Sequence, residues 1–327
     1  MGARPIRLGL VLAGLAGLAA AIPVGAVEAV HTFFSAADGV QIAADYYPPP
    51  VAERDLAPMA ILLHMYRSDR MAWEPLLAPL HDAGFAVLAI DLRGHGESAT
   101  TETREAALKR DTALFRKMQD DVRGAYDWLV QQPKVDRARF ALVGASVGCS
   151  VALQYAAKDR SVDAIVCLSP GLNYMGLDSA GDLHQMVGRK ILMLATEDER
   201  DAPYTLKKST PGVQVHICKQ EKLHGTDMLG QVPNIEKEIV SFLKTGVGEP
   251  SSTVVFGSIE KNIYHRADSG WVKEISPTNL RYYSSPQEAE ARGLRAAKSK
   301  GPSKQVPGDD KNERESNPAG QRRHGSR

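Results

Sequence analysis

The stretch Phe140-Ala-Leu-Val-Gly-Ala-Ser-Val-Gly148 constrains the fold more than any other part of the sequence. Its first four residues predict a buried strand, a turn of small residues follows, and residues 149–157 have the composition of a helix. A serine between two glycines on a sharp strand-to-helix turn is the pattern of a nucleophile elbow. Glycines leave room for backbones to approach closely, so we expect the Ser146 hydroxyl to be held out above the sheet edge.

The sequence around this stretch alternates short apolar segments with amphipathic ones. Strands are expected at residues 31–35, 41–47, 59–64, 86–91, 140–143, 164–168, 190–195 and 213–219, and helices at 71–83, 110–131, 149–157 and 235–243. Strands that alternate with helices predict an α/β fold, with a mostly parallel sheet and helices on both faces.

Four further motifs follow the expected strands, and their order along the chain fits a fold built around the elbow. Leu62-Leu-His-Met65 ends one expected strand, Asp91-Leu-Arg-Gly-His-Gly-Glu-Ser98 ends the next, acidic residues follow strand 190–195, and His224-Gly225 follows the last strand. On these motifs, residues 31–245 resemble the α/β-hydrolase superfamily, whose catalytic residues follow the order serine, acid, histidine. The resemblance implies an α/β-hydrolase fold and a serine esterase similar to the dienelactone hydrolases. It implies no cofactor and a small ester as substrate.

The resemblance also assigns the catalytic side chains. It makes Ser146 the nucleophile and His224 the base, because the family keeps its base in the loop after the last strand. The family's acid usually lies three residues beyond the end of its strand, which points to Asp198. The alternatives are Asp201, Glu197 and Glu199. His95 is expected to be structural and His216 to be a packing residue in its strand.

The oxyanion hole needs two backbone donors. Val147 N–H, at the start of the helix, is the first, and the loop after strand 59–64 should supply the second. Relatives often carry His-Gly there, whereas this chain has His64-Met65-Tyr66. Met65 can still donate through its backbone N–H, and Tyr66 is the alternative donor. The Met65 side chain should narrow the pocket, and residues 169–189 are too few for a large cap, so we expect an open site for small esters.

Residues 1–29 have the pattern of a signal peptide, with a basic start, an apolar run and small residues before position 30. The apolar run is about 15 residues, short of the roughly 20 that span a bilayer, so export to the periplasm or the exterior is favoured over an N-terminal membrane anchor. Three cysteines give no disulfide framework and are expected to be buried. A net charge of +1 gives no reason to expect a nucleic-acid partner.

The hydrolase pattern covers residues 30–246, and a small module is expected at 252–300. The module resembles the zinc-binding domain of the Ada DNA-repair protein, but the positions matching the ligands are His265, Ser269, Ala297 and Lys300. One ligand cannot make a four-coordinate site, so we expect no metal. Residues 301–327 are polar and charged and predict a disordered tail. The alternative function is a catalytically inactive hydrolase scaffold that binds a partner or an envelope polymer.

Overall fold

The computed structural model describes residues 28–50, 56–186, 188–210, 212–248, 255–258, 260–266, 269, 271, 275, 279–283 and 286–298. The expected signal peptide and the expected tail lie outside these residues, apart from positions 28 and 29. The chain divides into two compact units, Met1–Ser252 and Thr253–Arg327, and each is described by itself.

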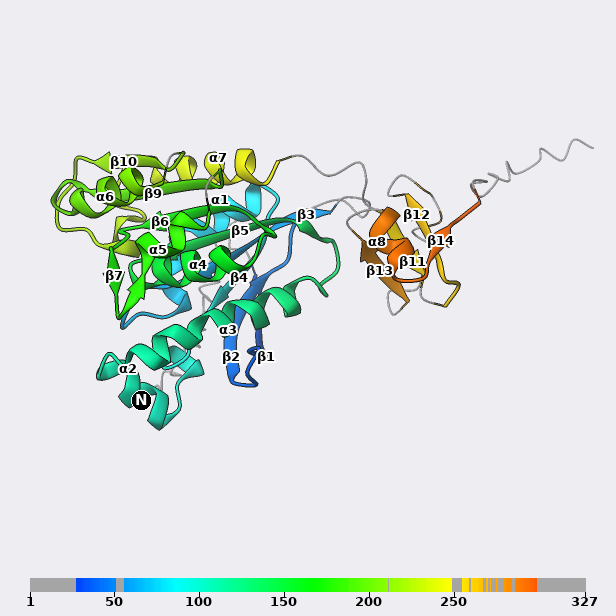
Figure 1. Cartoon of the computed structure of the whole chain (residues 1–327), viewed down its shortest axis with the longest axis horizontal. Helices are drawn as coiled ribbons and strands as arrows, with labels where there is room; N and C mark the ends of the chain where they lie inside the picture. The colour runs from blue at the N-terminus through cyan, green and yellow to red at the C-terminus, as the bar shows by residue number, and fades with distance from the viewer. Residues whose placement is uncertain are drawn as a thin grey trace, which may run out of the picture. The chain divides into compact units, whose positions relative to one another are not determined.

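The first unit is built on an eight-stranded sheet with the order β1-β2-β4-β3-β5-β6-β9-β10 (Figure 1). The strands are β1 (Val30–Ser35), β2 (Gln41–Tyr47), β3 (Ala57–Leu63), β4 (Ala86–Ile90), β5 (Val135–Ala145), β6 (Val162–Leu168), β9 (Lys190–Thr196) and β10 (Gln214–Cys218). β1 and β2 form an antiparallel hairpin, β2 pairs antiparallel with β4, and all the remaining pairs are parallel. The expectation of a mostly parallel sheet is therefore confirmed.

Helices cover both faces of this sheet. The α-helices are α1 (Glu74–Asp82), α2 (Thr101–Leu108), α3 (Thr112–Leu129), α4 (Val147–Lys158), α5 (Ser179–His184), α6 (Asp201–Ser209) and α7 (Ile235–Val247). Alternate residues of β3 pack into two different cores: Ile61 joins a core that includes residues of α3 and α4, and Leu62 joins a core that includes residues of α1 and α7. Burial on both faces explains why all seven residues of β3 are buried and apolar.

The order of the strands places the site. β3 has β4 on one side and β5 on the other, so the chain changes direction across the sheet at this point. In open α/β sheets, ligands bind beyond the carboxyl ends of strands at such a switch point. β3 ends at Leu63 and β5 at Ala145, immediately before the two motifs that carry Met65 and Ser146.

Some elements differ from the expectation. The helix expected at 71–83 is a 3-10 turn, η1 (Arg70–Trp73), followed by α1, and the helices α2 and α6 were not anticipated. Residues 169–189 hold a hairpin of two short strands, β7 (Asn173–Tyr174) and β8 (Leu177–Asp178), and the short α5, as few elements as expected. All three cysteines are free and buried, as predicted. Within the described residues, no helix combines the length and the apolar character that crossing a membrane requires.

The second unit contains a four-stranded sheet with the order β13-β11-β12-β14. Its elements are β11 (Val255–Ser258), β12 (Ile263–Arg266), β13 (Leu280–Tyr283), α8 (Pro286–Ala291) and β14 (Arg295–Ala296). Tyr264 of β12 packs with Val255, Ala289 and Leu294, and this small cluster is the core of the unit. His265, Ser269 and Ala297 lie within the described residues, whereas Lys300 lies outside them.

Candidate active site

Ser146 occupies the turn between β5 and α4 in a strained conformation. Its φ is 53° and its ψ is −117°, values that residues other than glycine rarely adopt. Its amide donates to Leu168 O at 2.8 Å, and its carbonyl accepts from Cys149 N at 2.9 Å. Strain of this kind costs on the order of 1–3 kcal/mol and tends to be retained at functional sites. The backbone on both sides therefore fixes Ser146 in a conformation that sequence preference alone would avoid.

The two glycines of the motif are required by backbone contacts. A Cβ at position 148 would lie 2.1 Å from Leu63 O, and one at position 144 would lie 2.4 Å from Gly148 O. No side chain fits at either distance. Gly144 and Gly148 therefore let α4 begin directly against the ends of β3 and β5. Val147 is the first residue of α4, so its N–H is one of the first-turn donors that have no partner within the helix.

His224 pairs with Glu199. His224 lies just before the 3-10 turn η4 (Gly225–Met228), and its Nδ1 is 2.5 Å from Glu199 Oε1. This hydrogen bond is the main cause that raises the pKa of His224 above its ordinary value. Gly225 N donates to Ser169 Oγ at 2.9 Å, which ties the histidine loop to the end of β6. The imidazole is thus held from one side by a carboxylate, leaving Nε2 for another partner.

The expectation that Asp198 would orient the histidine is wrong in its geometry. The Asp198 carboxylate accepts from Lys222 N at 3.2 and 3.3 Å, and Glu199 takes the place beside His224. Both residues lie in the 3-10 turn η3 (Glu197–Glu199), where neighbouring side chains point about 120° apart. The two remaining acids of this segment do not contact the histidine either, because Glu197 pairs with Arg200 and Asp201 begins α6.

Tyr174 was not among the expected site residues, but it lies beside the base. It lies in β7, its ring stands edge-on to the ring of His224 with centroids 6.4 Å apart, and its hydroxyl donates to Ser169 O at 3.4 Å. Burial raises the pKa of Tyr174 to about 12, so the hydroxyl stays protonated at neutral pH. The only signal in the sequence was an aromatic residue in the short segment after β6, which is weak.

The loop after β3 is fixed by His64. The His64 side chain is fully buried, with Nδ1 2.7 Å from Met65 O, and its Nε2 accepts from Leu92 N at 3.0 Å. Because Nε2 accepts, the proton is on Nδ1 and is donated to Met65 O. Burial lowers the pKa of His64 to about 3, so the ring is neutral. Met65 Sδ lies 3.1 Å from the point where a Cβ on Gly225 would stand, so its side chain reaches the histidine loop.

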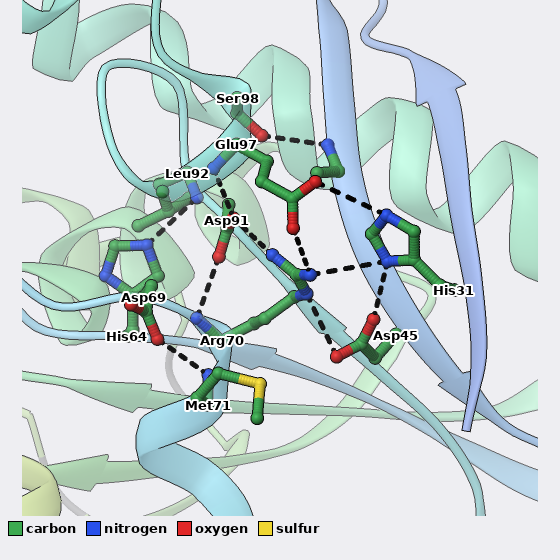
Figure 2. Close-up of polar contacts among 12 residues, drawn as sticks. His31, Asp45, His64, Asp69, Arg70, Met71, Asp91, Leu92, Glu97 and Ser98 are labelled. Carbon is green, nitrogen blue, oxygen red and sulfur yellow. Dashed lines mark hydrogen bonds and ion pairs between the residues drawn. The ribbon is translucent and has the colours of Figure 1, made fainter. Parts of the chain in front are cut away.

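A charged cluster around Arg70 also fixes the loop after β3 (Figure 2). The Arg70 guanidinium contacts Asp91 at 2.6 Å, Asp45 at 3.0 Å and Glu97 at 2.5 Å, and Arg70 N donates to Asp91 Oδ1 at 2.8 Å. The Asp91 side chain is fully buried and that of Arg70 is only 10% exposed. The cluster therefore joins the loop after β3 to the loop after β4 and to the β1–β2 hairpin, where His31 and Asp45 lie.

Three other residues considered in the sequence, Tyr66, His95 and His216, lie away from the catalytic groups. Tyr66 turns away from the elbow, because its hydroxyl donates to Ala107 O at 3.2 Å and its ring packs edge-on against His95. His95 is buried, with Nδ1 3.2 Å from Arg93 O, in keeping with a structural role. The expectation that His216 packs inside the protein is wrong: its side chain is 51% exposed and pairs with Glu238 at 2.7 Å.

No metal-binding cluster of three or more His, Cys, Asp or Glu side chains occurs among the described residues. A hydroxyl on a strained turn, an imidazole and a carboxylate are the parts from which nucleophilic acyl transfer is built.

Comparison with known proteins agrees with this geometry. Residues 59–206 match the family model described as Hydrolase_4, serine aminopeptidase, S33. An uncharacterized protein of Mycobacterium tuberculosis is 29% identical over 147 residues, which are 45% of this chain and 46% of that protein. An uncharacterized Escherichia coli protein is 32% identical over 111 residues, 33% of this chain and 36% of that one. The match thus spans less than half the length of these curated relatives.

Solved structures extend the comparison to about two thirds of the chain. An acetyl xylan esterase from a Paenibacillus species has a TM-score of 0.57 and 18% identity, covering 69% of this chain and 86% of its own. An esterase from Pyrococcus furiosus has a TM-score of 0.54 and 17% identity, covering 68% and 94%. A dienelactone hydrolase from Anabaena variabilis has a TM-score of 0.52 and 18% identity, covering 67% and 96%. From its sheet order, its elbow and these neighbours, the first unit of this chain has the α/β-hydrolase fold.

Proposed function

We propose that the protein is a serine hydrolase that cleaves small carboxylic esters through an acyl-enzyme on Ser146. The observation that carries the proposal is the pairing of His224 with Glu199 at the sheet edge where Ser146 is held in a strained turn. A serine hydroxyl is a weak nucleophile without a base, and a base needs an orienting acid. We assign the acid to Glu199 in place of Asp198.

The proposed reaction has two halves. His224 accepts the proton of Ser146 as Oγ attacks the ester carbonyl carbon, and the carbonyl oxygen becomes an oxyanion. The N–H groups of Val147 and Met65 hold this oxyanion. The C–O bond then breaks, and the leaving alcohol takes the proton from His224. In the second half, His224 takes a proton from water, and the resulting hydroxide attacks the acyl carbon. The bond from that carbon to Ser146 Oγ then breaks, His224 returns the proton to Oγ, and the carboxylic acid leaves.

The surroundings of the elbow favour a small acyl group. Relatives often have glycine at the position of Met65, and here the Met65 side chain reaches the histidine loop. Residues 169–189 form only a short hairpin and a short helix. The esterases among the structural neighbours support an ester as substrate. We therefore propose that short-chain esters are hydrolysed faster than long-chain ones. Export through residues 1–29 remains part of this proposal.

A panel of p-nitrophenyl esters of increasing chain length tests the proposal, with Ser146→Ala as the control. We expect the acetate and butyrate to be cleaved fastest and Ser146→Ala to lose about 10⁶-fold in kcat. Aminoacyl p-nitroanilides form a separate arm, because the family model that matches is named for an aminopeptidase. Faster cleavage of the anilides would replace the ester by a peptide. No turnover in either arm by the folded protein would favour an inactive scaffold that binds a partner or an envelope polymer.

A further inference from the structure

The second unit contains a cavity of about 550 Å³ on one face of its sheet. Successive residues of a strand point to opposite faces. Tyr264 of β12 points into the small core with Ala289 of α8, so its neighbours Ile263 and His265 point to the other face. Ile263 and His265 line the cavity, together with Ser258, the cross-strand partner of Ile263. The cavity is thus built on the sheet face opposite α8.

Positive charge dominates the lining of this cavity. Three cations line it: Lys261 in the β11–β12 turn, Arg295 in β14, and Lys298 just beyond. Among the described lining residues the carboxylate is that of Glu260, and its Oε2 accepts a hydrogen bond from Asn279 Nδ2 at 2.9 Å. Among the described lining residues, three cations thus face one carboxylate, an excess of two positive charges.

His265 reports the electrostatic character of the same wall. Burial lowers the pKa of His265, and the charge of Lys261 lowers it further. A carboxylate close to the ring would act in the opposite direction. The imidazole is therefore neutral at pH 7 and presents a hydrogen-bonding nitrogen near Lys261.

Apolar side chains also line the cavity. Trp271, whose side chain is 38% exposed, lines the cavity together with Ile263 and Ile275. An indole offers a planar face on which an aromatic ring can stack, with a contribution of about 0.5–1.5 kcal/mol beyond the burial of its area. The cavity volume lies within the range of small-molecule sites, roughly 300–1,000 Å³. The cavity thus offers an aromatic side chain for a flat ring and cations for an anion.

We propose that this cavity binds an aryl phosphate monoester. The dianionic phosphate would neutralise the two positive charges of the wall, and Arg295 can donate two parallel hydrogen bonds to phosphate oxygens. The aromatic ring would lie against Trp271. This site is independent of Ser146, so it stands or falls separately from the hydrolase activity.

Calorimetric titration of the full-length Ser146→Ala protein with 1-naphthyl phosphate tests the proposal, since that variant leaves no hydrolytic nucleophile to consume the ligand. Three comparison ligands separate the contributions: 1-naphthol has the ring alone, inorganic phosphate the charge alone, and 1-naphthoate the ring with a single negative charge. We expect 1-naphthyl phosphate to bind at least about tenfold tighter than each of them, and more weakly as salt is added. Equal affinity for naphthol or for inorganic phosphate would overturn the proposal, as would the absence of saturable binding.

Variants locate the binding in the cavity. Arg295→Gln and Lys298→Gln should each weaken 1-naphthyl phosphate about tenfold, because each removes a charged hydrogen-bond donor. Arg292→Gln is the matched control, since Arg292 is exposed on the same unit and does not line the cavity. Equal weakening by Arg292→Gln would show general surface attraction and refute the site. If Arg295→Gln lowers the melting temperature, Lys261→Gln in the exposed turn provides the same test without touching β14.

Discussion

Glu199 and Asp198 offer a sharp test of the catalytic geometry, because they are adjacent acids with different partners. Glu199→Gln keeps the shape of the side chain but removes the charge that faces His224 Nδ1 at 2.5 Å. Loss of the orienting carboxylate lowers kcat by about 10⁴-fold in triads of this kind, which is about 5.5 kcal/mol of transition-state stabilisation. Asp198→Asn is the matched control. Its carboxylate accepts from Lys222 N, and the hydrogen bond to His224 Nδ1 comes from Glu199, so the kcat of Asp198→Asn should stay within about threefold of the wild type.

The pH profile separates this effect from general damage. Glu199 raises the pKa of His224, and the base must be neutral to accept a proton. The acidic limb of kcat/KM in the wild type should therefore lie above the ordinary histidine value of about 6.5. In Glu199→Gln the acidic limb of the residual activity should shift to lower pH, because the hydrogen bond that raises the pKa of His224 is lost. Initial rates with p-nitrophenyl acetate from pH 5 to 9 measure both quantities. A crippled Asp198→Asn with a near-normal Glu199→Gln, or an acidic limb that does not move, would refute the assignment.

Three further outcomes follow from the described contacts. Arg70→Met should lower the free energy of unfolding by about 3–5 kcal/mol, because it leaves buried carboxylates unpaired, whereas the exposed Arg200→Ala should cost less than about 1 kcal/mol; equal urea midpoints would contradict this. Tyr174→Phe should lower kcat/KM about fivefold, because loss of the hydrogen bond to Ser169 O loosens the ring that lies against His224; an unaltered rate would remove Tyr174 from the site. Because the pKa of His64 is lowered in the folded protein, only the unfolded chain binds a proton at His64 just below about pH 6.5. The free energy of unfolding should therefore fall by up to about 1.4 kcal/mol per pH unit from pH 6.5 downward. His64→Gln should flatten that slope in urea titrations at pH 5 to 7, and an unchanged slope would contradict the buried neutral ring.

Much of the fold could be predicted because its determinants are local. The turn brings backbone atoms so close to positions 144 and 148 that only glycine fits there, so the glycine motif directly predicts the turn. The apolar strands lie under helices on both faces, which makes their burial readable from composition. The position of His224 followed from its place after the last strand.

The acid could not be fixed in the same way. Its position depends on whether the chain after β9 continues straight or enters a 3-10 turn, and the turn rotates Glu199, instead of Asp198, toward His224. A run of acidic residues carries no signal for that choice. Burial of His216 was expected from its strand, but β10 is the edge strand of the sheet, and the side chain reaches Glu238 at the surface. Tyr174 was missed because a two-residue strand has no periodicity to read.

The charged cluster around Arg70 could not be predicted from the sequence either. Its members come from β1, β2, the loop after β3 and the loop after β4, so no local pattern joins them (Figure 2). Only the fold brings these segments together. The cluster then fixes the loop that carries Met65, which links the antiparallel hairpin at one edge of the sheet to the proposed oxyanion donor.

Covalent labelling of the intact protein with a fluorophosphonate tests the central claim most directly. The phosphorus is attacked by an activated serine, fluoride leaves, and a stable phosphonyl ester remains on the protein, so a poorly activated hydroxyl is not modified. We predict one adduct per chain on the peptide that contains Ser146, with none in Ser146→Ala and much slower labelling in His224→Ala. Mass spectrometry of the intact protein and its peptides measures this. Labelling that persists in Ser146→Ala, or none in the folded wild type, would contradict the assignment of Ser146 as an activated nucleophile.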